Sequence, residues 1–181
     1  IDANGCSLMD SATINQPTPL VCIVIETNPL CHNDANGTLD LVISGGTQPY
    51  AANYISVSYP TSSNSIIISG LSAGSDSLFI TDANGCFDNT LVTLTNPLEL
   101  EINNLTKENP TCYNYADGVA SITVIGGTTP YTYLWNPGGQ TTNTAVGLMS
   151  GNYNYTITDV NGCTDTTSFT LNDPDEIQVI A

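Results

Sequence analysis

The feature that most constrains this chain is that its sequence repeats itself. The string Asp-x-Asn-Gly-Cys occurs three times, at residues 2–6, 82–86 and 159–163. The string Gly-Gly-Thr-x-Pro-Tyr occurs twice, at residues 45–50 and 126–131, and a cysteine precedes both at the same distance. Self-similarity at a fixed period is typical of proteins built from tandem structural units. The fold is therefore expected to be a small unit that is used more than once.

The spacing of these motifs divides the chain into four parts. Residues 17–96 and 97–173 are two full copies, each about 80 residues long. Residues 1–16 match the C-terminal end of a preceding copy, and residues 174–181 match the first strand of a following copy. The second copy is shorter than the first in one central loop. We therefore expect a segment of a longer tandem array.

Each copy shows the apolar pattern of short β-strands. Apolar residues alternate with polar or smaller ones at 39–43 and again at 120–124, which is the period of half-buried strands. Six or seven such strands in a unit of this size predict an all-β fold, an immunoglobulin-like antiparallel β-sandwich with Greek-key connections. Trp135 falls on the predicted third strand, where such folds place a core aromatic residue. The first copy has Ile55 or Val57 near that place.

Turn residues close the predicted strands at the repeated motifs. Asn-Gly is a strong signal for a two-residue hairpin of type I′, in which both central residues have positive φ. The aspartate of each motif is expected to accept backbone N–H bonds and to hold the turn. The Gly-Gly-Thr-x-Pro-Tyr string is expected to end one strand and redirect the chain into the next. The residues predicted to build the hairpin turns are Asp82, Asn84, Gly85, Asp159, Asn161 and Gly162.

The chain has six cysteines and no Cys-x-x-Cys pair, which favours disulfides formed outside the cytosol over a metal site. Strand direction suggests the pairing. If the first strand ends at Cys31, successive hairpins return the chain to the same end at Cys86, and the same count brings Cys112 beside Cys163. We therefore predict the bridges Cys31–Cys86 and Cys112–Cys163 within copies. Pairing between neighbouring copies, such as Cys86–Cys112, is expected to exceed the reach of a disulfide.

The other cysteines and the single histidine carry no predicted chemistry. Cys6 is left without a partner, and Cys22 lies in the apolar run 21–25, so we expect a buried free thiol there. His32 directly follows a cysteine assigned to a disulfide, and the second copy has Tyr113 at that position. A Ser-His-Asp or Cys-His arrangement is therefore not expected. We predict that the chain is not an enzyme.

The charge of the chain excludes several classes of partner. It has 1 Lys or Arg against 17 Asp and Glu, and a formal net charge of −16. Nucleic acids and anionic membranes are bound through clustered Lys and Arg, which this chain lacks. No apolar run is long enough to insert into a bilayer. A hydrophobic content of 40% is enough for a folded core, so disorder is disfavoured.

At these motifs the chain resembles the SprB-type repeat of gliding-motility adhesins and related giant surface proteins in Bacteroidetes. The family pattern is a cysteine before a strand, then Gly-Gly-x-x-Pro-Tyr-x-Tyr-x-Trp, Leu-x-x-Gly-x-Tyr and a closing Asp-x-Asn-Gly-Cys. The first copy departs from it, with Ala52 where Tyr133 stands and Asp76 where Tyr153 stands. The residues of the second copy that match are Gly126, Gly127, Pro130, Tyr131, Tyr133, Trp135, Leu148, Gly151, Tyr153, Asp159, Asn161, Gly162 and Cys163.

The resemblance implies a structural stalk segment of a long, secreted, cell-surface adhesin filament that serves gliding motility and surface attachment. Such proteins look like cargo of the type IX secretion system, so the implied location is extracellular, at the cell surface and attached to the outer membrane. The implied partners are neighbouring repeats of the same chain. Other parts of the protein would contact the gliding and secretion machinery. The family supplies no catalytic residues.

An alternative function is that of a carbohydrate- or protein-binding immunoglobulin-like module. Tyr54, Tyr59, Tyr113 and Tyr115 are candidate exposed platforms, because aromatic rings provide large, rigid contact area. A surface polysaccharide is then the candidate partner. Ordinary half-buried strand residues are the competing interpretation of the same tyrosines.

Two further hypotheses concern ions and sugars. No cofactor is expected, although side-chain oxygens near the turns are of the kind that calcium prefers. They lack the EF-hand spacing, and the second copy does not retain all of them. The candidate calcium ligands are Asp34, Asn36, Asp40, Asp82 and Asp88. Three short strings resemble an O-glycosylation acceptor of exported proteins in that phylum, with Ser11, Ser77 and Thr166 as candidate acceptors.

Overall fold

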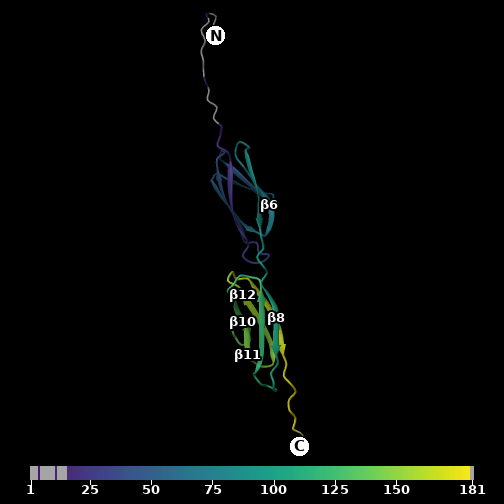
Figure 1. Cartoon of the computed structure of the whole chain (residues 1–181). Helices are drawn as coiled ribbons and strands as arrows, with labels where there is room; N and C mark the ends of the chain where they lie inside the picture. The colour runs from purple at the N-terminus through teal and green to yellow at the C-terminus, as the bar shows by residue number, and fades with distance from the viewer. Residues whose placement is uncertain (1–3, 5–10, 12–15, 180–181) are drawn as a thin grey trace. The chain divides into compact units, whose positions relative to one another are not determined.

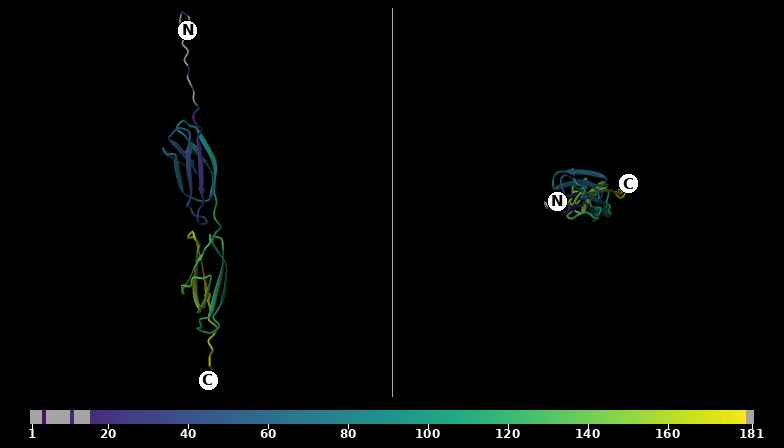
Figure 2. Two further views of the ribbon diagram at one scale, coloured as in Figure 1. Left: turned by 60° about the vertical axis from the view of Figure 1, so that its left-hand side comes forward. Right: turned by 90° about the horizontal axis from the view of Figure 1, so that it is seen from above.

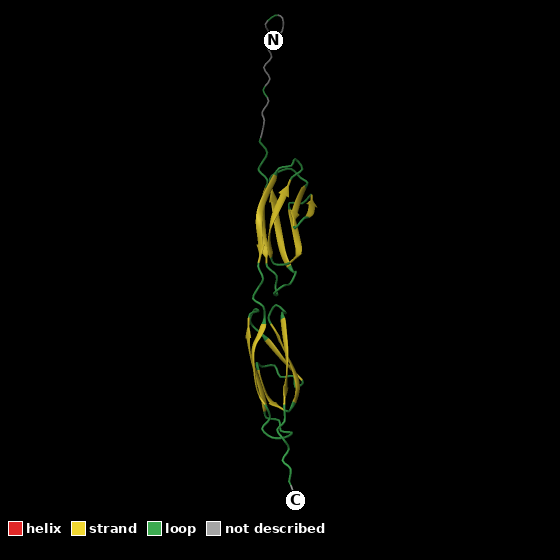
Figure 3. Ribbon diagram, turned by 90° about the vertical axis from the view of Figure 1, so that its right-hand side faces the viewer, coloured by secondary structure: helices red, strands yellow, loops and turns green. Residues whose placement is uncertain are grey.

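The computed structural model describes residues 4, 11 and 16–179, and all regular structure in these residues is β-strand (Figure 3). The chain forms two compact units. The first comprises the described residues of Ile1–Ile25, with Asp40–Ile67 and Asp76–Val92, and the second comprises Glu26–Leu39, Ile68–Ser75 and the described residues of Thr93–Ala181. No helix among the described residues is long and apolar enough to cross a membrane. The predicted all-β fold is confirmed, whereas the predicted limits of the copies stay predictions.

Seven of the described strands precede residue 97, and they form two sheets. The first sheet has the order β1-β2-β5, and the second has the order β4-β3-β6-β7. The strands are β1 (Val21–Thr27), β2 (Gly37–Ser44), β3 (Tyr50–Tyr54), β4 (Val57–Thr61), β5 (Ser65–Leu71), β6 (Gly74–Thr81) and β7 (Phe87–Leu94).

Six described strands follow residue 97, and they also form two sheets, with the orders β11-β9-β8 and β10-β12-β13 (Figures 1 and 2). They are β8 (Glu101–Glu108), β9 (Gly118–Ile125), β10 (Thr132–Asn136), β11 (Thr144–Leu148), β12 (Gly151–Thr158) and β13 (Thr164–Leu171). In each set a later strand returns to pair with the second one, β5 with β2 and β11 with β9. This crossing between sheets is the Greek-key connection of immunoglobulin-like sandwiches.

The two sets differ by one strand, at the place where the first copy has extra residues. Ile55 and Ser56 form a two-residue turn after β3, with Tyr54 opposite Val57 on β4. Both turn residues have positive φ, 46° and 60°, as a type I′ turn requires. In the second copy, residues 137–143 lead from β10 straight to β11 in the other sheet. The longer central loop of the first copy therefore provides β4.

Aromatic side chains fill the core of the second unit. Trp135 on β10 is fully buried, and its ring centroid lies 4.4 Å from that of Tyr155 and 5.8 Å from that of Phe169. Its indole N–H donates a hydrogen bond of 2.7 Å to the carbonyl oxygen of Thr142. The predicted core aromatic residue on the third strand is confirmed. The remaining buried core residues are Leu100, Ala120, Ile122, Ala145, Leu148, Tyr153, Ile157 and Leu171.

In the first copy, Tyr54 occupies the position that Trp135 has in the second. Tyr54 is 3% exposed, whereas Ile55 and Val57 are 53% and 49% exposed. The expectation that Ile55 or Val57 would fill this place is therefore wrong, and so is the expectation that Tyr54 is an exposed platform. The physical reason is the type I′ turn. Tyr54 is the last inward-facing residue of β3, and the chain turns back directly after it.

Tyr155 offers a test of the core of the second unit. Its hydroxyl is buried and has no hydrogen-bond partner among the described residues. Burial and the neighbouring Tyr133 raise the pKa of Tyr155, so the hydroxyl stays protonated. An unpaired buried hydroxyl costs about 1–3 kcal/mol. We expect Tyr155→Phe to increase the free energy of unfolding by about 1 kcal/mol, measured by urea denaturation.

The matched control is Tyr153→Phe. The hydroxyl of Tyr153 donates to the carbonyl oxygen of Met149 at 3.0 Å, so its loss should lower the free energy of unfolding by about 1 kcal/mol. Equal destabilisation by the two substitutions would contradict the unpaired state of the Tyr155 hydroxyl.

Candidate functional site

The two repeated motifs bind each other in the first unit. Oδ2 of Asp82 accepts the N–H of Thr47 at 2.9 Å, although the two residues are 35 positions apart. Oδ1 of Asp82 accepts the N–H groups of Asn84 and Cys86 at 2.9 and 2.8 Å. The side-chain amide of Asn84 also donates to Oγ1 of Thr47 at 2.9 Å. The aspartate therefore closes the hairpin and fastens it to the Gly-Gly-Thr loop.

The second unit repeats these bonds. Asp159 accepts the N–H of Thr128 at 2.8 Å and those of Asn161 and Cys163 at 2.9 Å. The side chain of Asn161 donates to Oγ1 of Thr128 at 3.1 Å. Both aspartates are about 5% exposed, and buried carboxylates of this kind need such donors. No role was predicted for this threonine, although it follows Gly-Gly in both copies.

The hairpins are not the predicted type I′ turns. Gly85 has a φ of 83°, but Asn84 is not among the described residues with positive φ. The N–H of Gly85 donates to the carbonyl oxygen of Asp82, and the N–H of Asp82 donates to that of Cys86. This is a three-residue loop, in which a type I turn is followed by a glycine bulge. The cause is the Asp82 side chain, since its Oδ1 accepts two N–H groups of the longer loop.

The first glycine of each Gly-Gly pair is required by a close backbone approach. Gly45 and Gly126 have φ values of 70° and 68°. A Cβ atom would lie 1.9 Å from the carbonyl oxygen of Pro19 at the first position and 1.7 Å from that of Glu99 at the second. The hydroxyl of Tyr131 donates to the Gly126 carbonyl oxygen at 2.5 Å. The Gly-Gly-Thr-x-Pro-Tyr motif therefore serves the fold, because only glycine fits there.

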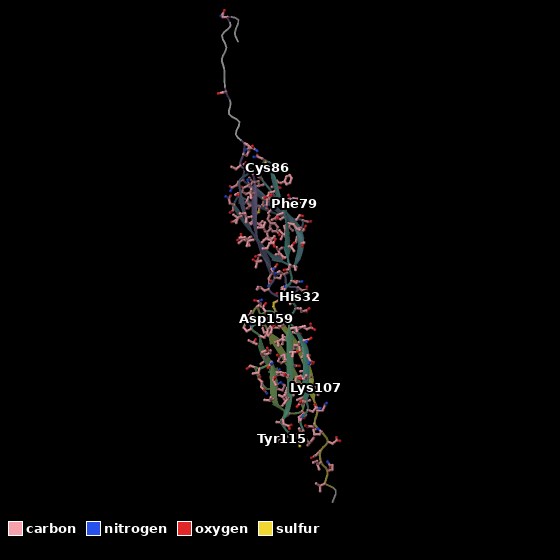
Figure 4. The ribbon with its side chains drawn as sticks, viewed as in Figure 1. His32, Phe79, Cys86, Lys107, Tyr115 and Asp159 are labelled. Carbon is pink, nitrogen blue, oxygen red and sulfur yellow. A yellow bond between two sulfur atoms is a disulfide. The ribbon has the colours of Figure 1, made fainter. Side chains whose placement is uncertain are left out.

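A disulfide joins Cys31 to Cys163, and both residues belong to the second unit. Their Cα atoms lie 5.5 Å apart, and the bridge spans a sequence separation of 132 residues. In Figure 4 the sulfur atoms lie beside the labels of His32 and Asp159. The bridge connects a cysteine of the first sequence copy with a cysteine of the second.

The predicted bridges Cys31–Cys86 and Cys112–Cys163 are wrong, since Cys86 and Cys112 are exposed free thiols. Strand β8 shows the physical reason. It begins beside Gly126 and the Asp159 hairpin, and it ends shortly before Cys112. The 8 residues of β8 extend about 26 Å, far beyond the reach of a disulfide. The loop cysteine and the hairpin cysteine of one copy thus lie at opposite ends of its first strand.

Polar contacts surround the bridge within the second unit. The Asn161 side chain donates to the carbonyl oxygen of Leu30 at 3.4 Å, and Nδ1 of His32 donates to that of Pro97 at 3.0 Å. Nε2 of His32 lies 3.8 Å from the Glu99 carboxylate, in a partly exposed pair. A surface pocket of about 620 Å³ lies here. Its lining includes the carboxylates of Asp34, Glu99, Glu101 and Asp165.

The candidate calcium ligands make other contacts. Asn36 accepts the N–H of Leu30 at 2.9 Å and donates to Asp34 at 3.2 Å, while Asp88 accepts the N–H of Cys22 at 2.9 Å. In the described part of the chain, no cluster of three or more His, Cys, Asp or Glu side chains is arranged to hold a metal ion. Calcium binding stays a hypothesis.

Cys22 is a free thiol, as predicted, but it is half-buried and not buried. Burial and the Asp88 carboxylate raise its pKa to about 11, so it stays protonated and unreactive at neutral pH. Among the candidate glycosylation sites, Ser11 and Thr166 are exposed and Ser77 is half-buried on β6. Glycosylation stays a prediction, and Cys6 lies outside the described residues.

Two segments of the chain match the SprB repeat, residues 24–51 and 104–140. Each match contains the loop cysteine and the Gly-Gly-Thr-x-Pro-Tyr motif of one copy. The resemblance seen in the sequence is thereby confirmed. A comparison with curated proteins found no match. Two segments of this immunoglobulin-like β-sandwich chain are thus similar to the SprB repeat.

Three solved structures are similar at low identity. A C-terminal 282-residue fragment of intimin, in complex with the intimin-binding domain of the translocated intimin receptor, has 10% identity and a TM-score of 0.44. The N-terminal eight Ig domains of Down syndrome cell adhesion molecule isoform 1.30.30 have 12% identity and a TM-score of 0.43. Fibronectin(III)-like modules of Clostridium thermocellum CbhA have 11% identity and a TM-score of 0.29. The aligned parts cover 87%, 84% and 83% of this chain and 65%, 24% and 94% of those chains.

The first prediction from this site concerns pH. Burial alone would raise the pKa of Asp82, but the N–H bonds from Thr47, Cys86 and Asn84 outweigh it and hold the pKa below its ordinary value of 3.8. The stabilisation of the folded state by the ionised Asp82 side chain is therefore complete above pH 3.8 and is lost as the pH falls through the lowered pKa. In Asp82→Asn, an amide that keeps its oxygen at the Oδ1 position places its NH2 group opposite the N–H of Thr47, so that two donors face each other. We expect a lower melting temperature at neutral pH than in the parent chain, and a smaller fall of the melting temperature in acid.

The control is Asp175→Asn, which removes an exposed carboxylate for which no hydrogen bond is seen. It should leave both the neutral-pH melting temperature and its fall in acid nearly unchanged. An Asp82→Asn protein whose melting temperature falls in acid as steeply as that of the parent chain would contradict the role given to this carboxylate.

The second prediction concerns the bridge. In the oxidised monomeric chain, peptide mapping by mass spectrometry should find Cys31 linked to Cys163, with Cys86 and Cys112 open to alkylation. In Cys31→Ser, Cys163 should become open to alkylation as well. A peptide linking Cys31 to Cys86, or Cys112 to Cys163, would contradict the structure.

Proposed function

We propose that this chain is a load-bearing stalk segment of a secreted cell-surface adhesin, in which β-sandwich repeats transmit force. The matches to the SprB repeat support an adhesin-type surface module. The observation that carries the mechanical role is the Cys31–Cys163 bridge, because it connects the two sequence copies covalently.

The bridge determines which residues would carry tension. A force applied to the two ends of the chain reaches Cys31 from the N-terminal side and leaves through Cys163. Residues 32–162 form a closed loop between these cysteines, and strands β2 to β12 lie within that loop. A pulled segment therefore cannot lengthen by unravelling these strands unless the disulfide is reduced.

The internal use of the repeated polar residues supports a structural role over a binding role. Asp82 and Asp159 are committed to backbone donors, and their asparagine neighbours bind the threonines of the Gly-Gly-Thr loops. No catalytic activity or cofactor is proposed. The net charge of −16 would make neighbouring segments repel one another and an anionic cell surface, which favours extension from the cell.

The wider setting belongs to the same proposal. The parent protein would be exported by type IX secretion, held at the outer membrane and used in gliding and surface attachment. These assignments depend on the SprB-repeat matches. The neighbouring repeats of the same chain are then the direct partners of this segment.

A binding module remains the second candidate, on a smaller surface than the sequence suggested. Tyr59 is half-buried on β4, but Tyr113 and Tyr115 are 46% and 60% exposed in the loop that contains Cys112. Specific binding of this chain to a polysaccharide, lost in the Tyr113→Ala/Tyr115→Ala variant, would favour that function over a stalk.

The test of the stalk is a pulling experiment on the full chain, held at its two ends. The oxidised chain should reach a maximum extension about 450 Å shorter than the reduced chain, because the bridge removes the segment between two cysteines 132 positions apart from the load path. Cys31→Ser is the control, and its extension should be the same with and without reductant. An oxidised parent chain that extends as far as the reduced one would rule out a covalent load path.

A further inference from the structure

Two exposed cysteines have no disulfide partner among the described residues, and each has a bonded counterpart in the other copy. Cys112 stands in the second copy where Cys31 stands in the first, in front of the same Gly-Gly-Thr motif. Cys86 stands in the first copy where Cys163 stands in the second, at the end of the same Asp-x-Asn-Gly-Cys motif. Cys31 and Cys163 form the observed bridge, whereas Cys86 and Cys112 are free.

The loop of Cys112 has the same backbone geometry as the bonded loop of Cys31. In both loops the N–H group three residues after the cysteine donates to the cysteine carbonyl oxygen, at 3.2 Å for Cys31 and 3.1 Å for Cys112. Asn33 and Asn114, two residues after these cysteines, have φ values of 61° and 55°. In the first loop the N–H of Leu30 donates to Oδ1 of Asn36 at 2.9 Å. In the second loop the N–H of Thr111 donates to Oδ1 of Asp117 at 2.9 Å. The loop is thus preformed without a bond.

The hairpin of Cys86 likewise has the geometry of the bonded hairpin of Cys163. The glycines before the two cysteines have φ values of 83° and 86°. The N–H groups of the two cysteines donate to the motif aspartates at 2.8 and 2.9 Å. The backbone bond from the aspartate to the cysteine carbonyl oxygen is 2.9 Å in both. In these backbone hydrogen bonds and φ values, Cys86 and Cys112 match their bonded counterparts.

We propose that Cys112 and Cys86 are disulfide sites for other copies of this same repeat. The observed bridge joins the loop cysteine of one copy to the hairpin cysteine of the next copy along the chain. By the same rule, Cys112 bonds the hairpin cysteine of a copy that follows residue 173. Cys86 bonds the loop cysteine of a copy that precedes residue 17. Each copy in an array is then bonded to both of its neighbours.

The surroundings of Cys112 fit a docking surface for such a copy. Tyr113 occupies the position of His32, the residue that contacts Pro97 beside the observed bridge. Tyr113 and Tyr115 are large, exposed rings next to the free thiol. Aromatic residues of this kind anchor protein interfaces, and here they flank the atom that would form the covalent bond.

The chemistry is an oxidation of two thiols by a disulfide donor. The thiolate of one cysteine attacks the donor disulfide and forms a mixed disulfide, and the second cysteine displaces the donor sulfur. One S–S bond forms between the copies and one breaks in the donor. The donor takes up the two electrons and the two protons and leaves as two thiols. An oxidised dithiol protein or oxidised glutathione supplies this step.

The test lengthens the full chain by a third copy, with residues 97–181 joined after Asp173 so that proline follows Asp173 as it does in the natural sequence. All cysteines become serine except Cys112 of the existing copy and Cys163 of the added copy. After oxidation with glutathione disulfide, we expect both thiols to be lost to alkylation and the intact mass to fall by two hydrogen atoms. Circular dichroism and a cooperative melt verify the fold.

Two variants of the unlengthened chain serve as controls under the same oxidation. The variant that keeps only Cys31 and Cys163 should form its bridge, and the variant that keeps only Cys112 and Cys163 should retain two free thiols. Free thiols in the lengthened chain, while the Cys31–Cys163 control is bridged, would overturn the proposal. A bridge in the Cys112–Cys163 control would overturn it as well.

A second measurement covers the case in which the serine variants do not fold. The lengthened chain with all its cysteines is assembled by ligation from an unlabelled part and a ¹⁵N-labelled third copy, and its disulfide peptides are mapped. A mixed-label peptide that joins unlabelled Cys112 to labelled Cys163 supports the proposal. An alkylated Cys112 in the unlabelled part refutes the proposal, whereas the labelled Cys112 of the third copy has no following copy and should be alkylated. Because the readout is a bond and not a force, failure here leaves the stalk function to be judged separately.

Discussion

The interaction on which the rest of this structure depends is the acceptance of three backbone N–H groups by one buried aspartate in each copy. Asp82 and Asp159 each hold a hairpin closed and fasten it to a Gly-Gly-Thr loop far away in sequence. That loop crosses the start of the copy so closely that only glycine fits. The same aspartate therefore positions the first strand, the loop and the cysteine that ends the hairpin. Bond formation at Cys163 follows from this placement.

These aspartates also show how a chain with 17 acidic residues and 1 basic residue folds. Carboxylates without cationic partners are stabilised by hydrogen bonds from backbone N–H groups, as at Asp88 and Asp165, which accept those of Cys22 and Ile102. Lys107 donates to the carbonyl oxygen of Thr170 and not to a carboxylate. Net charge is therefore tolerated through turn chemistry, which leaves the surface acidic.

Strand periodicity made much of the fold predictable, and side-chain geometry accounts for what was missed. The alternation at 39–43 and 120–124 identified inward-facing residues of β2 and β9. The hairpin type was missed because the aspartate side chain, not the Asn-Gly pair, determines the loop length. Tyr54 was misplaced because the type I′ turn lies at Ile55 and Ser56, neither of which is a usual residue for positive φ.

The bridge was missed for a different reason, which concerns topology. The predicted pairing assumes that each connection between strands is a hairpin that reverses the chain. Residues 137–143 are not such a hairpin, because they connect β10 to β11 in the other sheet. The number of residues between the cysteines does not favour the predicted pairing either. Loop-closure entropy grows with the logarithm of loop length, so a bridge across 132 residues costs less than about 1 kcal/mol more than a bridge within one copy. Loop-closure entropy thus hardly distinguishes the two pairings, and geometry determines which one forms. Because the first strand of a copy separates its loop cysteine from its hairpin cysteine, a bond to the next copy is the pairing that the fold permits.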